Sequence, residues 1–357
     1  MTTKDEVKAL WKLCFTDSDE FTDLYFDLRY KDDINMAVRE EGKIISALQM
    51  ISYPMTFCGE TIATSYVSGA CTHPDYRSHG AMRRLLRLTH RRMYDDGILL
   101  STLIPAEKWL FGYYAKSGYT PRFGYVMERV NVEKLIPSGS YRVEEEDEAS
   151  AELYQYFDNR MRERACCMLH SYEDFLVIMA DLRLGGGKVL VARRADRMAG
   201  MAFVVMDAGS LYIKELLADG IPGQTGFEAV KDTLLSAAVT LYPGAVIEYI
   251  HPSSGDSSTL GMARLIHVEK MLSILARKHP VLSLSIQIED DDAIPENNGY
   301  YIVENGNCYR EYREGREYHL YTIESLTAKS FETEHPYMSL MPVSYTHLRA
   351  HETSLHL

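Results

Sequence analysis

A short segment between an apolar stretch and a basic stretch carries the residues best suited to chemistry. It reads THPDYRSHGAMR and runs from Thr72 to Arg83. If a helix begins near its end, the first backbone N–H groups lack partners and the helix dipole is positive, which predicts an anion site. Gly80 would let a phosphate approach the backbone closely. Arg77 and Arg83 would add fixed positive charge for a diphosphate.

Three tyrosines follow in the segment FGYYAKSGYTP, residues 111–121. Aminolysis of a thioester needs a neutral amine and a proton for the departing thiolate. A tyrosine suits the second task because the pKa of a phenol lies above that of a thiol. Tyr113, Tyr114 and Tyr119 are therefore candidate acids. In a chain with 25 tyrosines, aromatic packing is the alternative.

The surrounding pattern predicts the elements that position these residues. Apolar residues at helical spacing predict one or two amphipathic helices over residues 4–29. Met36 begins a strand, a turn at Gly42 and a second strand. The elements expected after that are strands at 55–57 and 64–72, a loop at 73–80, a helix to about Asp95, a strand at 98–104, a helix at about 106–116 and a further strand.

A weaker copy of this order occurs later, with a period near 150 residues. Lys188 begins a strand, a charged turn and a strand, followed by the strand-like segment SLYIKELLAD and a helix over 227–242. The acidic stretch Glu144–Ser150 is expected to mark the beginning of this second unit. From His279 the alternating pattern LSLSIQIEDD…YIVENG predicts a third, α+β unit.

Composition limits the class of protein. The chain has 357 residues, a formal net charge of −13 and no apolar run of membrane-spanning length. The acidic balance argues against general nucleic-acid binding. Six scattered cysteines without C-x-x-C spacing predict reduced thiols and no metal site. We expect a cytoplasmic protein that lacks a secretion signal and forms a monomer or a homo-oligomer.

The C-terminal segment has a different origin from the rest. Val343–Thr353 reads VSYTHLRAHET and resembles a translated sequencing adapter. The tail Pro342–Leu357 also holds three of the twelve histidines. Such a run could indicate a metal-binding tail, but the adapter explains it better. We therefore expect the native fold to extend only to about Met341.

The R-x-x-G-x-[GA] loop between a strand and an amphipathic helix resembles the pyrophosphate loop of GNAT acetyltransferases. Here Met82 replaces the second small residue and Arg83 follows, which is similar to the Eis-like branch (enhanced intracellular survival acetyltransferases). The resemblance implies an α+β chain with a GNAT domain (1–137), a degenerate GNAT-like domain (138–278), a sterol-carrier-like domain (279–341) and the tail (342–357). The second domain has Gly220–Gly226 in place of the loop and no arginine there, so no second cofactor site is expected.

The resemblance also implies roles for residues. The backbone at Ala70, Cys71 and Thr72 would hold the pantetheine arm and acetyl carbonyl of acetyl-CoA. The diphosphate would lie on Arg77, Ser78, His79, Gly80, Ala81, Met82 and Arg83. In ordinary GNAT enzymes the acid is the tyrosine four residues before the glycine, here Tyr114. In the Eis-like branch it is the tyrosine after the glycine, here Tyr119, which we favour.

The general base implied by the Eis-like branch is the terminal carboxylate, expected near Tyr119 and supplied by the stretch Ser339–Met341. Glu107 is the alternative base. The predicted function is transfer of an acetyl group from acetyl-CoA to the primary amine of a small cationic molecule or a lysine side chain, without a metal, nucleic-acid or membrane partner. The alternatives are a non-catalytic CoA- or lipid-binding scaffold and a regulatory protein that uses its basic helix on nucleic acid.

Overall fold

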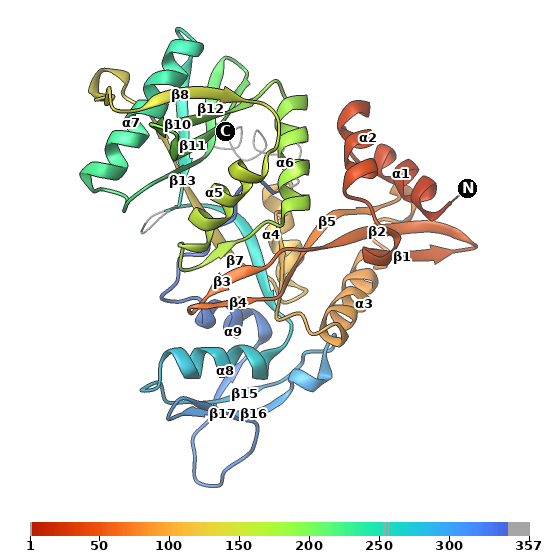
Figure 1. Cartoon of the computed structure of the whole chain (residues 1–357). Coiled ribbons are helices and arrows are strands. Elements are labelled where there is room, and N and C mark those ends of the chain that lie inside the picture. Colours follow the sequence, from red (N-terminus) through yellow and green to blue (C-terminus); the bar gives the residue numbers. More distant parts are fainter. Residues whose placement is uncertain (1, 253–254, 256, 342–357) are drawn as a thin grey trace. The chain divides into compact units, whose positions relative to one another are not determined.

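The computed structural model describes residues 2–252, 255 and 257–341, and its course is drawn in Figure 1. Two compact units form. The first combines residues up to Phe123 with Thr259–Pro336, and the second combines Gly124–Ser258 with the described residues from Tyr337 to Met341. The chain of the second unit is thus inserted into that of the first. The predicted domain boundaries at 138 and 279 differ from this division and remain a prediction.

Two capped helices open the first unit. In α1 (Thr3–Cys14), Thr2 accepts a hydrogen bond from the Asp5 amide, and Asp5 accepts one in return. In α2 (Asp19–Leu28), Ser18 accepts from the Phe21 amide. Such caps typically contribute about 1 kcal/mol each to helix stability. The two helices bury an aromatic cluster of Trp11, Tyr25, Phe26 and Tyr30. The prediction of one or two helices over 4–29 is confirmed, with two helices present.

The sheet of the first unit has the order β1-β2-β5-β6-β14. Strands β1 and β2 form the predicted hairpin, β2 pairs antiparallel with β5, and β5 pairs parallel with β6. Strand β14, from far along the chain, pairs antiparallel with β6. The bounds are β1 Asn35–Glu40, β2 Lys43–Ser52, β3 Met55–Phe57, β4 Glu60–Ile62, β5 Thr64–Thr72, β6 Leu100–Leu103 and β14 Ser258–Leu265.

Helices α3 (Ala81–Asp95) and α4 (Lys108–Ala115) follow β5 and β6. Leu85, Leu86 and Met93 of α3 are buried in one core with residues of β2, β5 and β6. The same unit contains a second sheet of order β17-β16-β15-β18 with two helices. Their bounds are α8 Val268–Lys278, β15 Leu284–Ile288, β16 Gly299–Glu304, β17 Asn307–Tyr309, β18 His319–Tyr321 and α9 Ile323–Ser330.

The sheet of the second unit has the order β7-β13-β12-β11-β10-β8, with β12 and β13 parallel. Glu144–Ser150 is predicted as a boundary, but its first residues belong to edge strand β8, where Glu144 and Glu145 pair with Arg193 and Lys188 of β10. The bounds are β7 Thr120–Arg129, β8 Arg142–Glu146, α5 Ala151–Arg162, β9 Cys167–Met168, α6 Tyr172–Leu184, β10 Lys188–Arg194, β11 Arg197–Asp207, β12 Ser210–Ala218, α7 Thr225–Leu241 and β13 Val246–His251.

The predicted internal repeat is visible in strand order. Each unit has an antiparallel hairpin with a register shift near its turn, at Val38/Arg39 in one and Ala192/Arg193 in the other. Each hairpin continues into a third strand that pairs parallel with a fourth after an intervening helix. No helix among the described residues is long and apolar enough to cross a membrane.

Candidate active site

The loop after β5 turns the chain into an open helix N-terminus. Ser78 and Gly80 adopt positive φ angles of 66° and 82°, and Gly80 is the N-cap of α3. Among the described residues, no side chain caps α3 and no acidic residue lies in its first turn. The first N–H groups of this helix are therefore available to an anion, as the sequence predicts.

The arginines of α3 divide into two groups. Arg91 and Arg92, near the C-terminus of the helix, form ion pairs with Asp95, Glu296 and Asp96. Arg83, Arg84 and Arg87, near its N-terminus, form no ion pair within the described parts of the chain. Uncompensated positive charge is thus concentrated where the helix dipole is also positive, and both effects favour an anion at the same end.

Strand β5 presents free backbone beside this loop. It pairs with β6 only from Thr64 to Tyr66, so its later residues have no partner on that side. Its register with β2 shifts between the pairs Ala47–Cys71 and Gln49–Ser68, which places a bulge at Gly69 and Ala70. Bulges of this kind often lie next to binding sites because they redirect backbone groups. A Cβ on Gly69 would lie 2.0 Å from the Trp11 ring, so glycine is required there.

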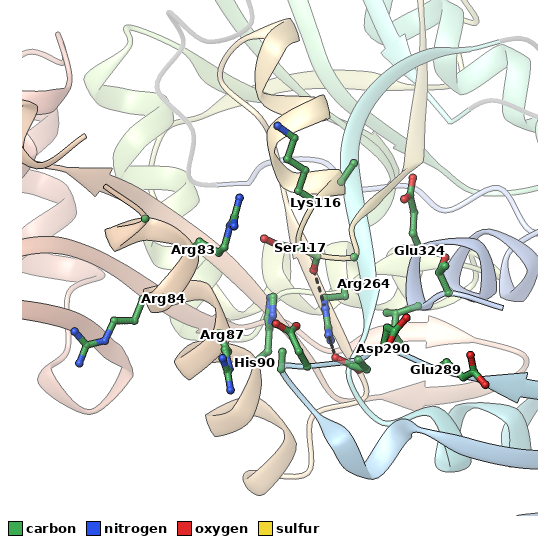
Figure 2. Close-up of a pocket in the computed structure, with 18 residues that line it drawn as sticks. Arg83, Arg84, Arg87, His90, Lys116, Ser117, Arg264, Glu289, Asp290 and Glu324 are labelled. Carbon is green, nitrogen blue, oxygen red and sulfur yellow. Dashed lines mark hydrogen bonds and ion pairs between the residues drawn. The ribbon is translucent and has the colours of Figure 1, made fainter. Parts of the chain in front are cut away.

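A cavity of about 490 Å³ lies between α3 and the end of α4. Its lining includes Gly80, Arg83 and Arg87 of the loop and α3, and Lys116 and Ser117 after α4. Figure 2 shows the arginines on one side and Glu289, Asp290 and Glu324 on the other. The first unit alone supplies all of these residues. The basic side suits a phosphorylated ligand that extends from the N-terminus of α3.

Tyr119 lies at the start of β7 and is completely buried. Its hydroxyl lies 2.7 Å from Ser101 Oγ and 3.0 Å from His90 Nε2. Burial raises the pKa of Tyr119 to about 12, against the effects of the Ser101 hydrogen bond and the Arg264 charge. Burial also holds the pKa of His90 well below its usual value, so this imidazole is neutral. Tyr119 is therefore a protonated phenol at the centre of a polar trio.

Tyr114 lies on α4, with its ring centroid 5.9 Å from that of Tyr119. Its side chain is 8% exposed, and burial raises its pKa. Tyr113, the third predicted candidate, is adjacent, and its ring contacts those of Tyr114 and Trp109. The structure thus brings Tyr114 and Tyr119 together. Tyr114 is 8% exposed to solvent, whereas Tyr119 is completely buried and contacts Ser101 and His90.

A buried ion pair fixes the corner between α4 and β7. Arg264 Nη2 donates to Asp291 Oδ1 at 2.7 Å, with side chains only 3% and 1% exposed, and Arg264 Nε donates to the carbonyl of Ser117 at 2.9 Å. Gly118, with φ 83°, makes the turn, because a Cβ there would meet Arg264 Nε at 3.0 Å. Arg264, Asp291, His90 and Ser101 carry no sequence motif, so sequence reasoning missed them.

Two cysteines lie at the end of β5, beside the loop. Cys14 Sγ donates to the carbonyl of Thr72 at 3.3 Å, and Arg77 Nε donates to the same carbonyl at 3.2 Å. A hydrogen bond with the Cys71 thiol, aided by the Arg77 guanidinium, lowers the pKa of Cys14 to about 6 despite partial burial. The predicted residues Cys71, Thr72 and Arg77 are thus adjacent, and Cys14 is an unpredicted neighbour.

Part of this chain is similar to known proteins. Residues 2–122 match the acetyltransferase (GNAT) domain family. No curated protein sequence matches the chain. Three solved structures are similar at 14–15% identity, which indicates a shared fold. The GCN5-related N-acetyltransferase from Anabaena variabilis is 14% identical at TM-score 0.75, covering 94% of this chain and 96% of its own. The corresponding protein from Kribbella flavida is 15% identical at TM-score 0.72, covering 94% of both chains. Eis1 from Mycobacterium abscessus is 14% identical at TM-score 0.69, covering 91% and 87%.

The second unit differs from the first at the corresponding helix. Just before the N-terminus of α7, the amide of Gly223 donates to Glu228 Oε1 at 2.9 Å, which places an acidic residue in the first turn of this helix. Beyond its pairing with β13, β12 carries Glu215, which is fully buried and pairs with Arg164 at 2.7 Å. Ser339 Oγ donates to the same carboxylate at 2.6 Å.

The two candidate bases lie in different surroundings. Glu107 is the N-cap residue of α4, where its side chain accepts a hydrogen bond from Trp109 Nε1. The stretch Tyr337–Met341 packs in the second unit, where Tyr337 pairs with Cys166 and Met168, and His170 contacts the carbonyl of Ser339 at 3.0 Å. The proposed adapter tail, Pro342–Leu357, lies outside the described residues. The terminal-carboxylate base remains a prediction.

Proposed function

We propose that this protein is an acetyl-CoA-dependent N-acetyltransferase that acts on a primary amine through its GNAT domain. The observation that carries the proposal is the N-terminus of α3. No described side chain caps it, and Arg83, Arg84 and Arg87 form no ion pair with any described residue. It lies beside strand β5, which pairs with β6 only from Thr64 to Tyr66. The family match over residues 2–122 supports it.

The diphosphate of acetyl-CoA would lie on the backbone of Ser78–Arg83 and on the side chains of Arg77 and Arg83. The pantetheine arm would follow β5 and accept and donate hydrogen bonds at Ala70–Thr72, which lack a strand partner toward β6. A backbone amide at this bulge would hold the acetyl carbonyl oxygen, where negative charge develops as the amine attacks.

In the reaction, the amine nitrogen forms a bond to the acetyl carbon, the carbon–sulfur bond breaks, and the thiolate takes a proton. Tyr119 and Tyr114 are the proposed proton donors. Tyr119 has a phenol proton that burial retains at neutral pH, and Ser101 and His90 could return a proton to it. Because Tyr119 is enclosed, a step through it requires movement of the α4–β7 corner, whereas the buried Tyr114 retains 8% exposure.

The acceptor class is a small cationic amine or a lysine side chain. The acidic residues Glu289, Asp290 and Glu324 on one side of the cavity would attract such a molecule over short distances. The amine must lose a proton before attack. Its acceptor for that proton would be a carboxylate, for which Glu107 and the native C-terminus are the proposed candidates.

The test is a panel of amines incubated with acetyl-CoA, with detection of the released thiol and mass spectrometry of the products. The panel would include aminoglycosides, polyamines, lysine and short peptides. Thiol release that depends on one amine, together with a product heavier by one acetyl group, would support the proposal. Saturable acetyl-CoA binding without turnover on any amine would replace it with a CoA-binding scaffold.

A further inference from the structure

A group of three potential metal ligands lies in the first unit, away from the residues of the cavity. Cys58 Sγ, a ring nitrogen of His279 and a carboxylate oxygen of Glu334 lie within 4.8 Å of one another. Cys58 occupies the turn between β3 and β4, His279 is the C-cap of α8, and Glu334 follows α9. The three residues are far apart in sequence, so no spacing motif could reveal them.

None of these three side chains has a hydrogen bond or ion pair within the described parts of the chain. Two further charged residues, Glu60 and Lys278, lie near Cys58. Glu60 forms an ion pair with Arg277. The negative charge of Glu334, close to a sulfur and a ring nitrogen donor, would favour a cation at this position.

We propose that Cys58, His279 and Glu334 bind a single Zn²⁺-class cation. A sulfur, a nitrogen and an oxygen donor together favour borderline ions such as Zn²⁺ or Co²⁺ over Mg²⁺ and Ca²⁺, which prefer oxygen alone. In a tetrahedral Zn²⁺ site the donor atoms are about 3.4–3.6 Å apart, as follows from bond lengths of about 2.0–2.3 Å. Contraction by about 1 Å through side-chain rotation brings the three atoms to that spacing.

On binding, Cys58 releases its thiol proton to solvent and coordinates as the thiolate, His279 coordinates through one neutral ring nitrogen, and Glu334 through one carboxylate oxygen. Water completes the fourth position. The ion would join the β3–β4 turn to the ends of α8 and α9, so it would stabilise the attachment of the 259–336 segment to the GNAT domain. The assignment does not depend on the proposed acetyltransferase activity.

The test uses full-length protein freed of metal with a chelator and then titrated with Co²⁺ under reducing conditions. A bound thiolate produces a sulfur-to-Co²⁺ charge-transfer absorption, which histidine and carboxylate ligands alone do not. We expect this absorption to saturate at one ion per chain and to be displaced by Zn²⁺. Replacement of Cys58 with Ser should abolish it, because the hydroxyl is a poor ligand.

Cys308→Ser is the matched control, because Cys308 is a half-buried free thiol of the same unit that does not belong to the ligand group. It should bind Co²⁺ as the unchanged chain does. The histidines His347, His351 and His356 can bind metal without a thiolate, and any such binding remains in Cys58→Ser. Glu334→Gln should keep the absorption but weaken binding at least about tenfold.

Zn²⁺ should also raise the melting temperature of the chain and of Cys308→Ser, but not that of Cys58→Ser, since only the native state has the site. Circular dichroism of metal-free Cys58→Ser establishes that it folds. The proposal is overturned if no charge-transfer absorption forms, or if it forms equally in Cys58→Ser. If Cys58→Ser does not fold, loss of the absorption in His279→Asn, with retention in Cys308→Ser, decides the question.

Discussion

The N-termini of α3 and α7 occupy the same place in two copies of one strand order, and they have opposite electrostatics. At α3 the chain offers Gly80, a first turn without acidic residues and arginines that form no ion pair with any described residue. At α7 the chain offers Gly223, whose amide already donates to Glu228. Farther along the matching strands, β5 has free backbone near Cys71, whereas β12 holds the buried pair of Glu215 with Arg164.

This contrast shows that the strand order alone does not determine the charge at a helix N-terminus. Both units retain the short parallel pairing, over three register pairs in β5–β6 and four in β12–β13, before the strands part. What differs is the charge near the N-terminus of the following helix, where α3 has no acidic residue in its first turn and α7 has Glu228. The same strand order can therefore present different electrostatics to a ligand.

The largest expected effect comes from a carboxylate placed at the N-terminus of α3. Gly80→Asp should abolish measurable acetyl-CoA binding in calorimetry, because its charge and bulk would meet the diphosphate. Gly223→Asp is a matched control, since the two glycines have φ angles of 82° and 83° and open space at the Cβ position. Both variants should lose about 1–2 kcal/mol of stability from the left-handed backbone, but only the first should lose binding. Equal affinity in both folded variants would remove the distinction between the units.

The buried pair of the second unit predicts a stability effect without a binding effect. Glu215→Gln leaves the mostly buried Arg164 without its bidentate carboxylate, so unfolding free energy should fall by about 3–5 kcal/mol in urea titrations. Glu145→Gln, which breaks the exposed pair with Lys188, should cost less than about 1 kcal/mol. Acetyl-CoA affinity should stay unchanged in both proteins. A loss of affinity in Glu215→Gln would mean that the second unit takes part in cofactor binding.

The tyrosine assignment predicts a ranking of rates. Tyr119→Phe should lower turnover about a hundredfold and leave acetyl-CoA affinity near that of the unchanged chain, because it removes only a proton donor. Tyr114→Phe should have the smaller effect. Steady-state kinetics on the best amine of the panel measures both. A larger loss of turnover in Tyr114→Phe than in Tyr119→Phe would assign the proton transfer to Tyr114, whose side chain is 8% exposed.

The smallest expected effect is a difference in thiol reactivity between the units. The pKa of Cys14 is lowered to about 6, so its reactive thiolate forms as pH rises through 6 and predominates at neutral pH. Burial raises the pKa of Cys167, in the second unit, to about 11, so it stays protonated. Iodoacetamide should therefore modify Cys14 at least about tenfold faster at pH 7, as peptide mass spectrometry would show. Similar rates would contradict the hydrogen-bonding arrangement at Cys14, Cys71 and Arg77.

The amino-acid sequence predicts local elements well where periodicity and turn residues agree. The strands at 55–57 and 64–72, the loop ending at Gly80 and the helix to Asp95 match the structure. The anion site is predictable because its parts are consecutive. Charge usually indicates solvent, but the acidic run that begins at Glu144 pairs across an edge strand, which its composition alone does not predict.

Features assembled from distant segments could not be predicted. The contact of Tyr119 with Ser101 and His90 depends on how α3, β6 and the segment after α4 pack, and the Arg264–Asp291 pair depends on the return of the chain after the second unit. The ligand group of Cys58, His279 and Glu334 is of the same kind. In each case the residues are close in space but far apart in sequence, so only the tertiary structure reveals the contact.

Strand β14 has a consequence for how the protein is made. It pairs with β6 at Leu103 and Leu100 through Met262 and Leu265, so the sheet of the GNAT domain lacks a member until about 265 residues have been synthesised. During translation the edge of β6 that pairs with β14 therefore stays exposed until the second unit and β14 have been synthesised. Gene fragments that end soon after the family match at residue 122 should for this reason give insoluble protein, and a usable minimal fragment must include the returning strand.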